Sequence, residues 1–191
     1  NHMKNWVRLG ILGLLLVLSN ISEATEHTCS VPDRALVVQA VRDCTEQYGP
    51  LVVKTGEISA TADGEITLGA VADGQEKTFS SSAAAVFING QLGITAALRP
   101  IAPEFYFAAR LYFDQQGVLR LVDGWYVGIE VEVLAVDTTR RALTVRPVDQ
   151  GATWRLTLSP LLPLSNSVLT PGDSCFLLLD WENNIRKVIG R

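Results

Sequence analysis

The spacing of apolar residues separates one helical stretch from a long series of strands. Residues 34–48 place Val38 and Val41 near helical spacing, and Gly49-Pro50 ends the stretch, so the pattern predicts one short helix. After Pro50, short apolar runs with alternating polar positions are separated by turn pairs such as Asn89-Gly90. This part of the chain is predicted to be all-β.

The apolar runs give a specific series of expected strands. Residues 92–100 are ambiguous and compatible with a turn of helix. The expected strands cover residues 51–61, 65–71, 76–80, 84–88, 104–114, 118–122, 126–137, 142–148, 153–158, 167–170, 175–180 and 185–189.

The strand series reads as two similar halves. Ile66-Thr67-Leu68 corresponds to Leu143-Thr144-Val145, and the run from Phe113-Asp114 corresponds to the run from Leu179-Asp180. A meander that curls into a small barrel removes exposed sheet edges. We therefore expect two tandem small β-barrel-like units of five to six strands each, at residues 51–124 and 125–191, preceded by one short helix.

The first 24 residues have the pattern of an export signal. Lys4 and Arg8 precede an apolar run from Leu9 to Ile21, and Ser22-Glu23-Ala24 offers small residues for a signal peptidase. The run is shorter than the roughly 20 residues that span a bilayer. We expect a signal peptide at 1–24, cleaved after Ala24, and a tail with the helix at 25–50. An uncleaved membrane anchor is the alternative.

Composition and charge narrow the classes of function. The 191 residues include 16 Lys and Arg against 20 Asp and Glu, a net charge of -4, and the basic residues form no stripe. Binding to nucleic acid depends on clustered basic residues, so no nucleic-acid partner is expected. His27 is the only histidine beyond the first two residues and lies near the predicted signal. We expect no catalytic residues, no metal and no cofactor.

Three cysteines leave the disulfide pairing open. An exported chain permits disulfides, but an odd number leaves at least one thiol free or pairs it between chains. Cys29 and Cys44 flank the predicted helix, and we expect this pair over Cys44 with Cys175. Cys175 lies in an apolar run and is expected to be buried.

Five residues are candidates for ligand binding. Trp125 and Tyr126 lie at the junction of the two units, where packing is expected for Trp125. Trp181 lies in a predicted turn, where it either packs the units together or contacts a glycan or protein. Glu130 and Glu132 point to one face of a strand, which indicates a solvated face or, as the alternative, the paired carboxylates of a glycosidase.

A set of positions across residues 51–190 follows a recurrent pattern. It comprises Gly56, Ile58, Ile66-Thr67-Leu68, Phe79, Val86, Asn89-Gly90, Asp114 to Val118 and Pro171-Gly172-Asp173. The pattern resembles the small repeated β-domains of exported and surface-layer-associated bacterial proteins, although Pro100 to Pro103 replaces the usual Pro-Gly-Asp in the first unit. The resemblance implies a non-catalytic structural or binding module.

These observations favour an exported, non-enzymatic binding or assembly module of the bacterial cell envelope. Its expected partner is a protein or glycan of the envelope, with membrane contact only through an uncleaved signal segment. One alternative is a carbohydrate-binding or carbohydrate-active envelope protein that uses Trp181 with Glu130 and Glu132. A second alternative is an inhibitor or docking subunit of a secreted complex.

Overall fold

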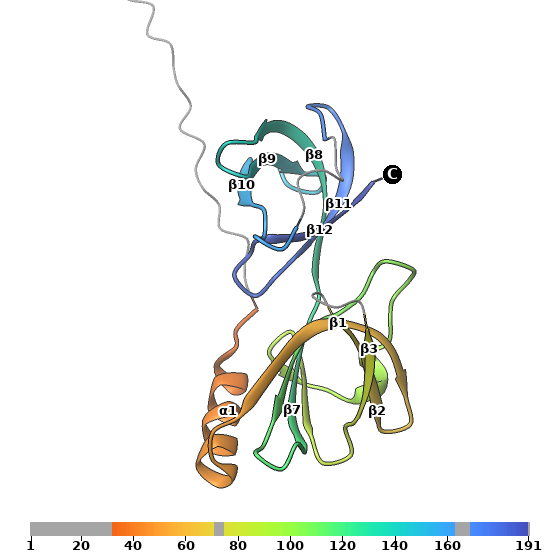
Figure 1. The fold of residues 1–191 in the computed structure, drawn as a ribbon. Coiled ribbons are helices and arrows are strands. Elements are labelled where there is room, and N and C mark those ends of the chain that lie inside the picture. The colour runs from red at the N-terminus through yellow and green to blue at the C-terminus, as the bar shows by residue number, and fades with distance from the viewer. Residues whose placement is uncertain (1–31, 71–74, 163–168, 191) are drawn as a thin grey trace, which may run out of the picture.

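The computed structural model describes residues 32–70, 75–162 and 169–190, and these consist mainly of strands. One helix, α1 (Ala35–Tyr48), precedes a seven-stranded sheet and a five-stranded sheet (Figure 1). The expectation of a mainly β fold with one N-terminal helix is confirmed. The predicted signal peptide and Cys29 lie outside the described residues.

The first sheet has the strand order β3-β2-β1-β6-β7-β4-β5. All neighbouring strands are antiparallel except β4 and β7, which run parallel. A short 3-10 helix, η1 (Thr95–Leu98), follows β5. The strands are β1 (Val52–Ala62), β2 (Glu65–Ala70), β3 (Glu76–Ser80), β4 (Ala85–Ile88), β5 (Gln91–Leu92), β6 (Ala108–Phe113) and β7 (Leu119–Trp125).

The second sheet repeats the order of the first five strands of the first. Its order is β10-β9-β8-β11-β12, which corresponds strand for strand to β3-β2-β1-β6-β7, again antiparallel throughout. Tyr126 alone separates the end of β7 from the start of β8. The strands are β8 (Val127–Asp137), β9 (Ala142–Pro147), β10 (Trp154–Thr157), β11 (Ser174–Leu179) and β12 (Ile185–Gly190).

The irregularities of the two sheets also repeat. The pairing of β1 with β2 shifts after Ile58, which lies opposite Leu68, and the pairing of β8 with β9 shifts after Val133, which lies opposite the corresponding residue Val145. A second shift before Phe113 recurs before Leu179. β-bulges fix the register and bend of a strand, so their shared positions support the duplication expected from the sequence.

The two Asp-led turns have the same hydrogen bonds. Oδ1 of Asp114 accepts from the amides of Gln116 and Val118, each at 2.9 Å. Oδ1 of Asp180 accepts from the amides two and four residues later, at 3.0 and 2.7 Å. Burial alone would raise the pKa of Asp114, but hydrogen bonds from Val118 and Arg120 hold it below its ordinary value. The aspartate side chain therefore forms the turn in place of a backbone partner.

The sequence predicted that each unit closes into a barrel, and here the structure differs. The strands form sheets of seven and five, and the described residues show no closed barrel. Both sheets nevertheless curl, since the segment that follows the third strand runs parallel to the last strand. In the first sheet this segment is β4, beside β7, and in the second it is Leu158, which forms a bridge with Ile185. The alternation of apolar and polar residues along a strand does not show which strand will pair with it in parallel, so the sequence did not predict this pairing.

Each curled sheet encloses a core of its own. Residues such as Ile58, Leu111 and Val122 point inward in the first sheet, and Val133, Leu177 and Ile185 do so in the second, all with exposed fractions of 0%. Alternate residues of the same strands therefore point outward, away from these cores.

The helix covers the outer face of the first sheet. Val37, 1% exposed, packs against Phe87 of β4 and Leu121 of β7. Of the two apolar residues at helical spacing in the sequence, Val41 packs against this cluster, whereas Val38 is 54% exposed because it lies on the other side of the helix. Oδ1 of Asp33 accepts a hydrogen bond from the Ala35 amide at 2.9 Å, so it satisfies one of the amides that the first turn of the helix leaves free.

One further expectation about the strands is corrected, and another falls partly outside the described residues. The predicted strand at 104–114 begins only at Ala108, since the preceding residues form a loop closed by the bridge between Ala102 and Phe105. Glu104 in this loop has a positive φ of 70°, a left-handed conformation outside the extended region of regular strands. The predicted strand at 167–170 lies partly outside the described residues.

Candidate functional site

Two separate elements cover the outer face of the first sheet. Helix α1 covers one end, and the turn between β11 and β12 covers the other, with Trp181 packed on Ala108 and Trp125. The outward side chains form three cross-strand pairs between β6 and β7, which are Tyr112 with Leu121, Arg110 with Asp123 and Ala108 with Trp125. The second sheet is thus docked on the first through residues of its own turn.

A pair of stacked indoles forms the centre of this contact. The ring centroids of Trp125 and Trp181 lie 6.3 Å apart with planes inclined by 28°. Trp125 is fully buried and Trp181 is 9% exposed. The guanidinium carbon of Arg110 lies 4.2 Å from the centroid of Trp181, and Nη2 of Arg110 donates to Glu182 at 2.9 Å. Trp125 therefore packs as expected, and the ring of Trp181 is in contact with other residues of the protein.

A buried ion pair lies beside the indoles. Asp123 has a fully buried side chain and is bound by the guanidinium of Arg34, at the start of α1. The Arg34 guanidinium carbon is also 5.9 Å from the ring centroid of Trp125. Burial raises the pKa of Asp123 above its ordinary value, although Arg34 opposes this shift. One acid thus contacts the helix while lying next to the junction of the two sheets.

The residue that links the sheets is held by an asparagine. Nδ2 of Asn89 donates to the carbonyl of Tyr126 at 2.9 Å, and Oδ1 of Asn89 accepts from the Tyr126 amide at 2.8 Å. Asn89 has a φ of 49° in the Asn89-Gly90 turn, a left-handed conformation that asparagine tolerates. The predicted turn pair therefore also clamps the connection between the sheets.

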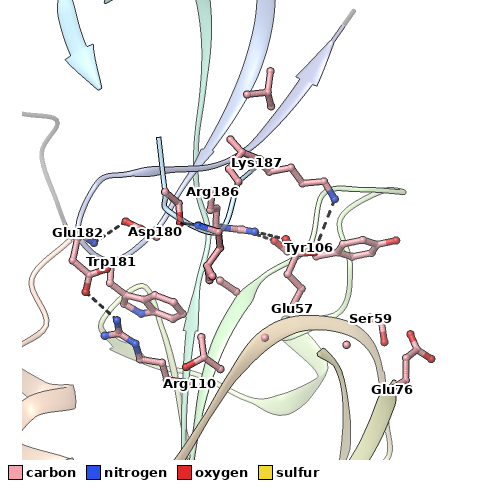
Figure 2. Close-up of a pocket in the computed structure, with 18 residues that line it drawn as sticks. Glu57, Ser59, Glu76, Tyr106, Arg110, Asp180, Trp181, Glu182, Arg186 and Lys187 are labelled. Atoms are coloured by element: carbon pink, nitrogen blue, oxygen red, sulfur yellow. Dashed lines mark hydrogen bonds and ion pairs between the residues drawn. The ribbon is translucent and has the colours of Figure 1, made fainter. Parts of the chain in front are cut away.

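Arg186 on β12 reaches from the second sheet to the first (Figure 2). Its Nη1 donates to Oε1 of Glu57 at 2.7 Å, and its Nη2 donates to the carbonyl of Tyr106 at 2.6 Å. Nζ of Lys187 lies 3.9 Å from Oε2 of Glu57. Burial lowers the pKa of the Arg186 guanidinium, and Glu57 opposes this change. A largely desolvated ion pair therefore joins the sheets.

The equivalent arginine of the first sheet has a related task. Arg120 follows the Asp114 turn as Arg186 follows the Asp180 turn. Its Nε donates to Oδ2 of Asp114 at 2.7 Å, and its guanidinium carbon lies 3.9 Å from the ring centroid of Tyr48 at the end of α1. The arginine after each Asp-led turn thus contacts the part of the chain that precedes its own sheet. This part is helix α1 for Arg120 and the first sheet for Arg186.

A cleft of about 710 Å³ lies beside this contact, between the two sheets (Figure 2). Small residues form its wall on the first sheet, namely Thr55, Ser59, Gly69 and Ala108. Apolar residues and one serine line the side of the second sheet, namely Ser159, Leu161, Leu162 and Val188. Charged residues also line the cleft, namely Glu57, Glu76, Arg110, Asp180, Glu182, Arg186 and Lys187. The cleft therefore combines small and apolar residues with charged ones.

The structure brings together only part of the predicted site. Trp125, Tyr126 and Trp181 lie at the junction, but Glu130 and Glu132 do not line the cleft. Glu132 accepts a hydrogen bond from Arg146 at 2.5 Å on the second sheet, and both side chains are partly exposed. Glu130 lies opposite Phe176 in the strand pairing. The two carboxylates therefore do not share a site with Trp181.

Sequence reasoning missed the ionic residues of the junction. Arg34, Glu57, Asp123 and Arg186 are far apart along the chain and carry no motif. Two signals were present, however. Asp123 interrupts the apolar run of β7, and Arg186 occupies the position of Arg120 in the predicted duplication.

The two described cysteines are both free thiols. Cys175 is 1% exposed in the core of the second sheet, as expected, and Cys44 is half-buried on α1. Burial raises the pKa of both thiols, so neither is activated as a thiolate. The alternative pair of Cys44 with Cys175 is therefore absent from the described structure, whereas Cys29 lies outside the described residues.

The pairing of Cys29 with Cys44 stays a prediction. In the exported protein this bond would close a loop of about 15 residues and stabilise the fold by roughly 3 kcal/mol in the chain-entropy picture. Peptide mapping without reductant should yield a linked peptide that contains both residues. Three free thiols in the exported protein would contradict the prediction.

No model of a known protein family matches the chain, and no curated protein matches it. Among the described helices, none is long and apolar enough to cross a membrane. The same part of the chain contains no group of three or more His, Cys, Asp or Glu placed to hold a metal ion.

Proposed function

We propose that this protein is an exported, non-enzymatic binding module of the bacterial cell envelope. Its ligand is a polypeptide segment of a partner protein, bound in the cleft between the two sheets. The observation that carries the proposal is the cleft itself, whose volume of about 710 Å³ lies within the range of about 300–1,000 Å³ typical of ligand sites.

The lining of the cleft favours a polypeptide. Thr55, Ser59 and Gly69 present a row of small side chains on neighbouring strands, which leaves room for an extended chain. Leu161 and Leu162 offer apolar contacts on the opposite wall. A polypeptide supplies apolar side chains for the wall and charged or polar groups for the charged residues of the cleft.

The aromatic residues are less suited to a glycan. A sugar ring binds on an open aromatic face, but Trp125 and Arg110 lie over the ring of Trp181. Nζ of Lys187 lies 5.0 Å from the ring centroid of Tyr106. Carbohydrate binding remains the alternative that the experiment below distinguishes.

The charged groups of the cleft support binding over catalysis. A general acid or base must be free to exchange a proton with substrate. Glu57 is instead engaged with Arg186, and Glu182 is engaged with Arg110. These pairs position the walls of the cleft and leave the partner to be recognised by shape and by other contacts.

A cleft-blocking variant tests the proposal. Leu161 is 72% exposed at the cleft and Leu92 is 74% exposed on β5, so Leu161→Arg and Leu92→Arg form a matched pair with little effect on stability. In a screen of peptide and glycan libraries, we expect peptides that bind the unmodified chain and Leu92→Arg equally. Leu161→Arg should bind them at least about tenfold more weakly, a loss of one apolar contact.

Other outcomes of the screen would reject the proposal. Equal binding of the selected peptides to both variants would place the site elsewhere. Glycan binding that Leu161→Arg abolishes, without peptide binding, would favour the carbohydrate alternative. An absence of binding to either library would also count against a peptide-binding cleft.

A further inference from the structure

Gly69 of β2 lines the cleft at a position where packing does not require a glycine. A glycine inside a strand weakens it, and it often marks a place where a ligand or another backbone comes close. A Cβ added to Gly69 would meet only the carbonyl oxygen of Glu57, at 3.6 Å, which is an ordinary contact. By contrast, a Cβ at Gly56 would lie 2.4 Å from the carbonyl oxygen of Gly69, and one at Gly124 would lie 2.3 Å from Leu98. Close packing therefore explains Gly56 and Gly124 but not Gly69.

The duplication offers a comparison within the same molecule. Gly69 lies opposite Glu57 in the pairing of β1 with β2, next to the pair at which the register shifts. Arg146 lies opposite Glu132 at the equivalent place in the pairing of β8 with β9. The side chain of Arg146 donates to Glu132 at 2.5 Å, so the second sheet carries a long side chain where the first sheet carries none. The shared fold thus accommodates a large residue at this position.

The vacant position opens onto one part of the cleft. Figure 2 shows the pair of Glu57 and Arg186 with Trp181 on one side and Glu76 on the other. Gly69 lies between Glu57 and Glu76 in the strand pairing. The space over Gly69 therefore lies in the part of the cleft away from the indole stack.

We propose that Gly69 is the specificity-determining residue of the cleft and accommodates one bulky apolar side chain of the bound polypeptide. This assignment rests on the proposed function, because it says which part of the ligand enters the cleft and where. Packing at the centre of an interface is as dense as in a protein interior. A position left vacant between two side chains of the sheet is therefore filled by a side chain of the partner.

The charges around Gly69 favour an apolar side chain at this point of the ligand. Oε1 of Glu57 accepts from Arg186 at 2.7 Å, and Oε2 of Glu57 lies 3.9 Å from Nζ of Lys187. A cation from the ligand would compete with these two, and an anion would be repelled by Glu57. Glu76, on the other side of Gly69, is exposed and keeps its charge in water. An uncharged side chain avoids the cost of desolvating a further charge.

A variant that fills the position tests the assignment. Gly69→Val adds a side chain that strands favour and that occupies the proposed space. Gly190→Val is the matched control, because Gly190 at the end of β12 also has open space for a Cβ but does not line the cleft. Peptides selected with the unmodified chain should bind Gly190→Val equally and Gly69→Val at least about tenfold more weakly. The midpoint of urea denaturation of Gly69→Val should be unchanged or higher.

A second peptide screen, carried out with Gly69→Val, distinguishes direct contact from an indirect disturbance. It should select peptides in which one large apolar residue is replaced by glycine or alanine. These peptides should bind Gly69→Val at least as tightly as they bind the unmodified chain. Such a complementary exchange of size is expected only if the replaced side chain of the ligand lies on Gly69.

The outcomes separate this assignment from the proposed function. Equal binding of the selected peptides to Gly69→Val, with the loss for Leu161→Arg retained, would overturn the role of Gly69 and leave the peptide-binding cleft in place. Identical peptides from the two screens would also overturn it. A lower urea midpoint for Gly69→Val would show that the fold requires the glycine, with the same consequence. An absence of peptide binding to the unmodified chain would reject the proposed function and this assignment together.

Discussion

Replacing Trp125 with alanine is expected to lower the free energy of unfolding by about 3–5 kcal/mol, the usual cost of deleting a buried indole. Trp125 is fully buried and packs against Ala108, Trp181 and Val127, which belong to both halves of the chain. Its loss leaves a cavity at the junction that small neighbours such as Ala108 cannot fill. Urea denaturation followed by circular dichroism measures the change.

A second substitution distinguishes the stability that comes from ring packing from the stability that comes from side-chain volume. Trp125→Phe keeps a ring against Trp181 and should lose less stability than Trp125→Ala. Glu130→Gln, on a partly exposed strand face away from the cleft, should change stability by less than about 1 kcal/mol. A loss below about 1 kcal/mol for Trp125→Ala would mean that the indole stack does not hold the sheets together.

The repeated strand order could be predicted from the sequence because the residues that mark it act within their own turns and strands. An aspartate that bonds amides two and four residues later needs only its own turn, so Asp114 and Asp180 mark equivalent places directly. The apolar triplets of the second strands, such as Ile66-Thr67-Leu68, show which face is buried. Strand order and bulge positions then followed the expected correspondence.

The parallel strand pairing and the loop conformations could not be predicted as well, because they depend on contacts between residues far apart in the sequence. The parallel pairing of β4 with β7 joins residues more than 30 positions apart and leaves no mark in the alternation of either strand. The aromatic residues at 105–107 look like the start of a strand. They form a loop instead, since Glu104 adopts a positive φ and Phe105 turns to pack on Phe176 of the second sheet.

The sequence predicted only the aromatic residues of the candidate site. Trp125 and Trp181 are rare and large, so their place at a junction and a turn was informative. Arginines and glutamates are common on every surface, and nothing in the sequence distinguishes Glu57, which bonds across the junction, from Glu132, which bonds within one sheet. Only the docking of the two sheets decides which ion pairs form.

Replacing Glu57 with leucine is expected to lower the free energy of unfolding by about 3 kcal/mol. The substitution leaves Arg186, 9% exposed, without its carboxylate partner, and a buried cation without its partner is costly. Glu182→Leu is the matched control, because Glu182 also pairs an arginine across the junction but is 57% exposed. Its loss should cost less than about 1 kcal/mol, the value of an exposed pair. Equal losses in urea denaturation would contradict this difference.

A double-mutant cycle isolates the ion pair itself. Arg186→Met removes the cation but keeps an unbranched apolar side chain, and in the double variant neither charge is left unpaired. We therefore expect the double variant to be more stable than the sum of the two single losses predicts, by at least about 1 kcal/mol. Lys187 contacts Glu57 at 3.9 Å and partly replaces the missing guanidinium, so Arg186→Met should cost less than Glu57→Leu. Additive losses would show that Glu57 and Arg186 act separately in holding the two sheets together.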